Sequence, residues 1–215
     1  MVDRLGAARK RRRKHAFSDE QVFRIITKLI LDEGITGVSL PAIAKHLGYS
    51  HQALTYRYVN RAGMLEHYAA WVRQRTVEAQ EAVIRASATP LAAFRAVMVA
   101  GAVGYLGEAE AATDSGLMTR LFVEMQRDPD VRPLMKHIEG SGRERLVAIV
   151  AESQRLGELT DRFAPIVIVD ATAYAAFGAA AVHVGEPYPA MMQRIQSAVE
   201  STLRPFLPEV VGARP

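Results

Sequence analysis

The residues best suited to recognising another molecule lie together in residues 51–58. Leu54 and Tyr58 are four residues apart, so on a helix both side chains point to one side and pack inward. The opposite face then carries His51, Gln52, Thr55 and Tyr56. Glutamine can form two hydrogen bonds with an adenine edge, threonine offers a hydroxyl and a methyl group, and histidine or tyrosine can reach a base or a phosphate. This pattern predicts a helix that reads the major groove of DNA.

Two further helices are predicted just before this segment. Ser18 and Gln21 form a capping box at the start of a first helix, which Gly34 ends. Ser39 caps a second, short helix that ends at Gly48. A short helix, a glycine-containing turn and another short helix, supported by an earlier one, make a helix-turn-helix unit.

The same unit continues into a longer fourth helix. Ser50 can cap the helix at 51–58, and Asn60 can cap one that runs from Arg61 to about Ala86. Arg61, at the start of that helix, is predicted to hold a phosphate, and Arg57 to contribute a base or phosphate contact. The residues predicted to contact DNA within this unit are Ser39, Ser50, His51, Gln52, Thr55, Tyr56, Arg57 and Arg61.

A basic arm precedes the first helix. Residues 1–17 carry seven lysines and arginines and one acid, a net charge of +6 within a chain of net +4, so the rest of the chain is slightly acidic. An arm of this kind can neutralise phosphates without making the folded body repel itself, which favours a nucleic acid as its partner. The alternative is a solubilising tail. The arm residues predicted to bind DNA are Arg9, Lys10, Arg11, Arg12, Arg13 and Lys14.

Helical periodicity continues to the end of the chain, and no sustained alternation of period two is present, which predicts an all-α protein. Turn residues separate helices expected at about 91–107, 115–127, 130–156, 165–184 and 188–207, or about nine helices in total. We expect a basic arm (1–17), a DNA-binding domain (18–68) and a ligand-binding and dimerisation domain (69–215).

Composition and motifs favour a binding protein of the cytoplasm over an enzyme. The 215 residues include no cysteine, so neither a disulfide nor a cysteine nucleophile is possible. The six histidines include no pair three or four residues apart, and no nucleotide-binding or hydrolase motif is present. We therefore expect no catalytic residue, metal or cofactor. Residues 165–184 are long and apolar enough for a membrane span, but the many alanines and Asp170 favour a helix buried in protein.

Apolar residues at helical spacing in the C-terminal part suggest a binding site for a small, largely apolar molecule. Glycines at 101, 104 and 107 withhold side chains, methionines give adaptable walls, and Asp170 with Tyr174 could supply a polar contact. The alternative is an ordinary core. The candidate residues are Phe94, Met98, Gly101, Tyr105, Leu117, Leu121, Phe122, Met125, Asp170, Tyr174 and Phe177.

Residues 18–68 resemble the DNA-binding segment of TetR-family transcriptional repressors. The resemblance is carried by the ungapped run Gly-Ile-Thr-Gly-Val-Ser-Leu-Pro-Ala-Ile-Ala-Lys-His-Leu-Gly-Tyr-Ser at 34–50, followed by Leu54, Tyr58, Asn60, Arg61 and Leu65. One position departs from the pattern: the family usually has a phosphate-contacting tyrosine directly after the recognition-helix leucine, and this chain has Thr55, with Tyr56 one place later.

The resemblance implies a homodimer joined through the last two helices, a palindromic DNA operator and an effector pocket in the C-terminal domain. Ala171, Ala175, Ala179 and Val182 would let a partner helix approach closely. The alternative is an intrachain core helix at 165–184. The competing function is an adaptor that binds an acidic partner through its arm and has no ligand switch.

Overall fold

The computed structural model describes residues 17–103, 123, 127–129, 132–183 and 186–208. Within these ranges the chain forms eight α-helices and two short 3-10 helices, and it contains no strand. The prediction of an all-α fold is therefore confirmed. Almost all of the helix expected at 115–127 lies outside the described residues.

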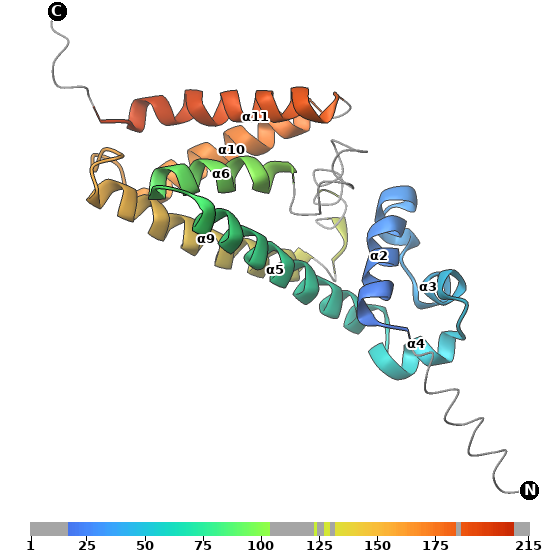
Figure 1. Cartoon of the computed structure of the whole chain (residues 1–215). Coiled ribbons are helices and arrows are strands. Elements are labelled where there is room, and N and C mark those ends of the chain that lie inside the picture. The colour runs from blue at the N-terminus through green and yellow to red at the C-terminus, as the bar shows by residue number, and fades with distance from the viewer. Residues whose placement is uncertain (1–16, 104–122, 124–126, 130–131, 184–185, 209–215) are drawn as a thin grey trace, which may run out of the picture. The chain divides into compact units, whose positions relative to one another are not determined.

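The chain divides into two compact units, Met1–Tyr68 and Ala69–Pro215. The first unit contains a tight cluster of short helices (Figure 1). Its elements are α2 (Asp19–Glu33), η1 (Ile35–Gly37), α3 (Leu40–Leu47), α4 (His51–Tyr58) and the first residues of α5 (Arg61–Ala86). Buried apolar side chains of α2, α3 and α4 form its core.

The second unit contains the rest of α5 and longer helices that pack side by side (Figure 1). Its other elements are α6 (Pro90–Val103), α9 (Arg132–Arg155), α10 (Pro165–Val182), α11 (Tyr188–Leu203) and η2 (Arg204–Phe206). Helix α10 contacts α6, α9 and α11. A single apolar core, which includes Phe94, Val150, Ile168, Ile195 and Leu203, joins these four helices.

Local capping explains where the helices of the first unit begin. The Ser18 hydroxyl accepts a hydrogen bond from the backbone N–H of Gln21, whose side chain accepts one from the backbone N–H of Ser18, so the capping box is present. Ser39 caps α3, and the Asn60 side chain accepts from the backbone N–H of Gly63 at the start of α5. Because such caps satisfy otherwise unpaired N–H groups with neighbouring residues, they can be predicted from sequence alone.

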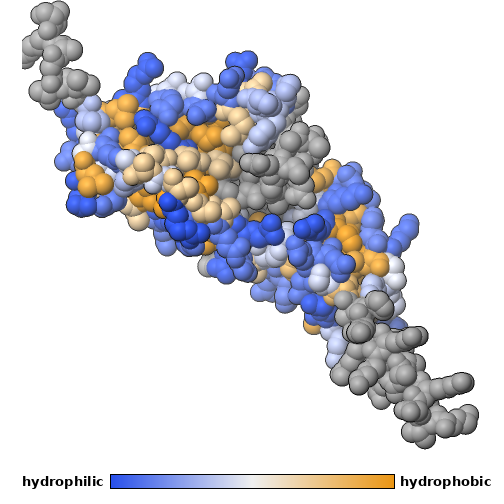
Figure 2. All heavy atoms as spheres, viewed as in Figure 1, coloured by the Kyte–Doolittle hydropathy of each residue, from blue (hydrophilic) through white to orange (hydrophobic). Residues whose placement is uncertain are grey.

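Helix α10 is apolar on all sides but is only partly covered. Its 18 residues have a mean hydropathy of 1.6, long and apolar enough to cross a membrane, and 28% of them are buried within the chain. The side facing the core carries Ile168, Thr172 and Ala176. The opposite side exposes Val167 (47%), Tyr174 (75%), Phe177 (43%) and Val182 (78%). On the face of the second unit seen in Figure 2, apolar surface likewise lies among hydrophilic side chains.

Candidate nucleic-acid interface

Helix α4 presents the polar face that its spacing predicts. Leu54 and Tyr58 are buried, with 0% and 2% of their surfaces exposed. His51 and Gln52 are exposed, and Tyr56 is 94% exposed. An almost fully exposed tyrosine beside an amide and an imidazole leaves hydrogen-bonding groups and an aromatic ring free of the core, as contact with base edges and phosphates requires.

The Thr55 hydroxyl is used within its own helix. It donates to the backbone carbonyl of His51 at 3.1 Å and lies 3.2 Å from Nε2 of the same residue. Such a bond to the carbonyl four residues earlier is common for threonine in helices. Thr55 must release this bond to donate to a phosphate, whereas Tyr56 extends into solvent.

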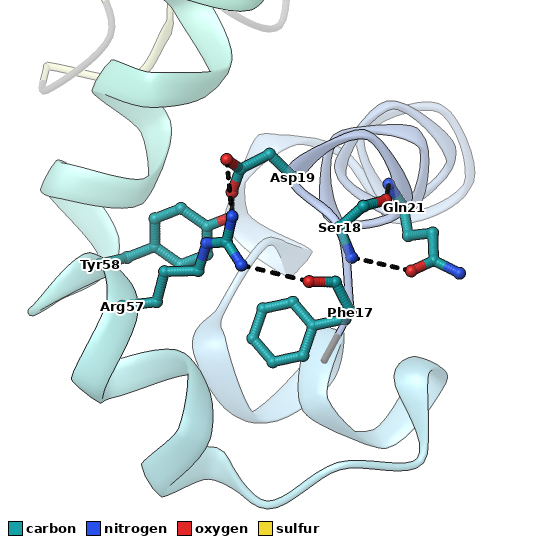
Figure 3. A network of polar contacts seen from close by, with 6 residues as sticks. All are labelled: Phe17, Ser18, Asp19, Gln21, Arg57 and Tyr58. Carbon is teal, nitrogen blue, oxygen red and sulfur yellow. Dashed lines mark hydrogen bonds and ion pairs between the residues drawn. The ribbon is translucent and has the colours of Figure 1, made fainter. Parts of the chain in front are cut away.

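Helix α4 is fastened to the start of α2 by a polar network (Figure 3). The Arg57 guanidinium pairs with the Asp19 carboxylate at 2.8 Å and donates to the backbone carbonyl of Phe17 at 3.1 Å. The Tyr58 hydroxyl donates to the other oxygen of the same carboxylate. The guanidinium also lies 5.5 Å from the centroid of the Phe17 ring, within the range of a cation–π contact. Two consecutive residues of α4 therefore bind the residues that open α2.

The network perturbs two pKa values in opposite directions. Burial acts to raise the pKa of Asp19, but hydrogen bonds from Tyr58 and Arg57 and the Arg57 charge outweigh it, so this pKa lies below its usual value. Burial and the hydrogen bond to Asp19 raise the pKa of the Tyr58 hydroxyl well above its usual value. At neutral pH the carboxylate is therefore ionised and the phenol keeps its proton, which is the pairing that the network needs.

Arg61 also has partners inside the unit. Its Nε donates to the Val38 carbonyl at 2.8 Å and its Nη2 to the Ile35 carbonyl at 3.0 Å. Arg61 thus ties the start of α5 to the segment that leads into α3. In the structure each of the guanidinium groups of Arg57 and Arg61 helps to hold the helices together, and their predicted contacts with DNA remain predictions.

The corner between α4 and α5 is strained. Val59 has φ 66° and ψ −59°, and the backbone N–H of Asn60 donates to the Tyr58 carbonyl at 2.7 Å, so Val59 is the central residue of a γ-turn. A positive φ is unfavourable for a β-branched residue. Gly63 supports the corner because a Cβ there would lie 2.5 Å from the Tyr58 carbonyl oxygen. The backbone of Val59, at the end of α4, is therefore held in a conformation that is unfavourable for valine.

The remaining predicted DNA contacts are two serines, Ser39 and Ser50, and the cations of the arm. Ser39 uses its hydroxyl to cap α3, accepting from the backbone N–H of Ala42 at 3.3 Å. Ser50 precedes α4, but its side chain makes no capping hydrogen bond, so the predicted cap of this helix is wrong. The arm cations Arg9 to Lys14 lie outside the described residues.

The contacts that fasten α4 to the start of α2, which we call the anchor of α4, were not predicted from the sequence. Asp19 and Phe17 lie 39 and 40 residues from their hydrogen-bond partners Tyr58 and Arg57. An acid in the first turn of a helix is commonly explained by the helix dipole, so Asp19 gave no signal of a long-range partner. Only packing of α2 against α4 brings these groups together.

The predicted small-molecule site is only partly described. Phe94 (0% exposed) and Met98 (6%) lie in the core of the second unit, and Gly101 is half-buried on the same helix, α6. Five of the candidates fall outside the described residues: Tyr105, Leu117, Leu121, Phe122 and Met125.

The structure corrects the prediction for the three candidates on α10. Asp170 accepts a hydrogen bond from Nε of Arg143 at 2.9 Å and forms a second, shorter contact with the same guanidinium. Tyr174 and Phe177 are exposed rather than enclosed. Because the apolar residues of α10 are distributed around the helix, their periodicity could not show which side faces the core, and Asp170 with Tyr174 was expected to supply a polar contact to a bound molecule.

Comparison of the whole fold with solved structures gives extensive matches. The ketosteroid transcriptional regulator KstR2 of Mycobacterium tuberculosis matches with a TM-score of 0.65 at 12% identity, covering 91% of this chain and 98% of that one. SmeT, the repressor of the Stenotrophomonas maltophilia multidrug efflux pump SmeDEF, matches with a TM-score of 0.70 at 18% identity, covering 91% and 93%. A TetR/AcrR-family regulator from Thermobifida fusca matches at 0.62 and 20% identity, covering 92% and 98%.

The chain has the fold of TetR-family transcriptional regulators. No protein-family model and no curated protein matches the sequence. The likeness therefore lies in the arrangement of helices. Since each match covers about nine tenths of this chain, the TetR-type fold describes both units and not only the helix-turn-helix.

Proposed function

We propose that this protein is a TetR-family transcriptional regulator, which acts in the cytoplasm as a homodimer and represses transcription by binding a near-palindromic operator. A small, largely apolar molecule bound in the second unit releases the DNA. The observation that carries this proposal is the outward face of α4, with its 94% exposed Tyr56, on a helix fastened to a TetR-type fold.

In this proposal α4 enters the major groove. Gln52 and Thr55 read base edges, while His51 and Tyr56 contact bases or phosphates. Arg57 and Arg61 keep the helices in position, and the basic arm adds contacts to the backbone. Because phosphate contacts are independent of sequence, the arm supplies affinity and α4 supplies specificity.

The exposed side of α10 supports the homodimer. The exposed side of α10 carries an apolar stripe formed by Val167, Tyr174, Phe177 and Val182. Only 28% of the 18 residues of this helix are buried within one chain. A second copy of the same helix, related by a twofold axis, would cover this stripe and exclude water from it. Twofold symmetry then predicts two recognition helices and half-sites about 34–36 Å apart, or a multiple of that distance.

In this proposal the effector binds in the second unit near α6, where Phe94 and Met98 lie in the apolar core and Gly101 is half-buried. Among the solved structures of this fold, KstR2 is described as a ketosteroid transcriptional regulator and SmeT as the repressor of a multidrug efflux pump. To release DNA, the effector must bind more tightly to a conformer whose recognition helices no longer fit the half-sites.

The deciding experiment is a binding-site selection from random duplexes with the full-length protein. The proposal predicts enrichment of an inverted repeat, with the selected duplex bound at least a hundredfold more tightly than a scrambled one at the same salt concentration. Equal affinity for selected and scrambled duplexes would favour the adaptor function, in which the arm binds any acidic partner.

A further inference from the structure

The junction between the basic arm and the folded chain is held by the recognition helix. We propose that Arg57 is a positioning residue that fixes the start of the arm beside α4, so that arm and helix engage the same stretch of duplex. This inference rests on the proposed function, because it assumes that α4 binds DNA.

Phe17 is the last residue of the arm and the first that the structure describes, and it is held from two sides. Its backbone carbonyl accepts the hydrogen bond from Arg57. Its ring packs edge-on against Tyr49, in the turn between α3 and α4, with the ring centroids 5.2 Å apart. Phe17 is 7% exposed. The point where the arm leaves the body is therefore fixed relative to both the turn and the recognition helix.

Chain length limits how far the arm can reach from that point. Lys14 precedes Phe17 by three residues, which span at most about 11 Å when fully extended. Arg9 precedes it by eight residues, at most about 29 Å. Chain length therefore keeps the six cations of residues 9–14 within about 29 Å of Phe17, so the phosphates that they can reach depend on where Phe17 is held.

The surroundings of Arg57 favour this role over a direct phosphate contact. Its guanidinium is already paired with Asp19 and bound to the Phe17 carbonyl. The Asp19 carboxylate offsets its positive charge, so the pair presents little net charge to DNA. The guanidinium also lies 5.5 and 5.8 Å from the ring centroids of Phe17 and Tyr58. Replacing it with methionine would remove the hydrogen bond to the Phe17 carbonyl and the ion pair with Asp19, whereas the Tyr58–Asp19 hydrogen bond and the buried Leu54 would still hold α4.

The test is a double-mutant cycle in the full-length protein with the selected operator. Arg57→Met is introduced into the native chain and into a chain in which Arg11, Arg12, Arg13 and Lys14 are replaced by Gln. Affinity is measured across a range of salt concentrations, where each phosphate contact contributes about −0.9 to the slope of log K against log salt.

In the native background we expect Arg57→Met to weaken binding. The slope of log K against log salt should become less steep by about 0.9 to 1.8, the equivalent of one to two phosphate contacts. In the Gln-arm background we expect no further change in the slope. An equal change in both backgrounds would show that Arg57 contacts DNA itself or loosens α4 generally, and it would overturn the inference.

Controls separate positioning from loss of the fold. Arg24→Met removes an exposed arginine of α2 that pairs with Glu20 and is outside the network, and it should leave slope and affinity unchanged. If Arg57→Met lowers the melting temperature so far that binding cannot be measured, Phe17→Leu removes the ring contacts with Tyr49 and Arg57 but keeps an apolar side chain at this buried position, and the same arm-dependent change is expected. Failure of the unaltered chain to prefer its operator would refute the proposed function, whereas arm-independence of both variants would refute only the inference.

Discussion

Helices α4 and α10 each leave one side uncovered, and the two sides differ in chemistry. The uncovered side of α4 carries His51, Gln52 and Tyr56, whereas that of α10 carries Val167, Tyr174 and Val182. Polar groups on the first can bond to a hydrated partner such as DNA, while the apolar side chains of the second gain free energy only by leaving water. Exposure alone therefore does not identify a partner, but the chemistry of the exposed side indicates its class.

The two helices are also held in different ways. Helix α4 is short, and in addition to its buried residues Leu54 and Tyr58 it is fixed to its unit by directional contacts from Arg57 and Tyr58 to Asp19 and Phe17. Helix α10 is held by side-chain packing against α6, α9 and α11. Directional contacts set an orientation and can be removed by one substitution, whereas packing is spread over many residues.

The largest effect is expected where charge is placed on the apolar stripe of α10. Tyr174→Glu combined with Val182→Glu should convert the dimer into a monomer, because two carboxylates per chain would be buried without partners. Operator affinity should fall at least a hundredfold, since a monomer binds one half-site. Sedimentation velocity without detergent measures the first effect. Ala151→Glu, on the exposed side of α9, is the matched control, and a doubly substituted chain that still sediments as a dimer would place the interface elsewhere.

A smaller effect is expected from Gln52→Ala on the polar side of α4. Loss of a bidentate base contact typically costs about 1–3 kcal/mol at one base pair. We expect weaker binding to the operator, relaxed preference at one position of each half-site and an unchanged salt slope, measured by repeating the site selection. Gln74→Ala, at an exposed position of α5, should alter none of these. An unchanged motif and affinity for Gln52→Ala would mean that α4 does not read bases.

Asp19→Asn should test the anchor of α4 through its pH dependence. Because the folded-state pKa of Asp19 is lowered, its contribution to stability is present above the usual carboxyl pKa of about 3.9 and is lost as the pH falls through the lower folded-state value. At pH 7 we expect a loss of about 1 kcal/mol, since water screens the half-exposed carboxylate. Urea unfolding of both chains at pH 7 and pH 3 should show this difference shrinking with acid. Asp32→Asn, at an exposed position of α2, should show neither effect.

The smallest effect is expected at the corner after α4. Val59→Gly removes a strain of order 1–3 kcal/mol but adds about 1 kcal/mol of chain entropy to the unfolded state, so stability should change little or rise by up to about 1 kcal/mol. The same substitution should loosen the orientation of α4 and lower operator affinity. Val77→Gly, inside α5, should instead destabilise by about 1 kcal/mol or more. A loss of that size for Val59→Gly would show that the γ-turn stores no strain.

The features that depend only on neighbouring residues could be predicted from the sequence. The caps at Ser18, Ser39 and Asn60 and the inward pair Leu54 and Tyr58 follow from contacts within four residues, so their positions could be predicted and the structure confirms them. The type of each helix and the exposed side of α4 were accessible for the same reason.

Tertiary structure decided which distant groups meet and which side of a uniformly apolar helix is covered. Arg57 and Arg61 can bind a phosphate as readily as a carbonyl, and only packing of α2, α3 and α4 brought the carbonyls of Phe17, Val38 and Ile35 within their reach. Tyr174 and Phe177 share one side of α10 with its single charged residue, Asp170, but the other sides are apolar too, so only the helices packed against α10 selected Ile168 and Thr172 for burial. Contacts between near neighbours can be predicted from the spacing of residues. Long-range hydrogen bonds and the choice of the buried side of a helix depend on groups that meet only when the chain folds.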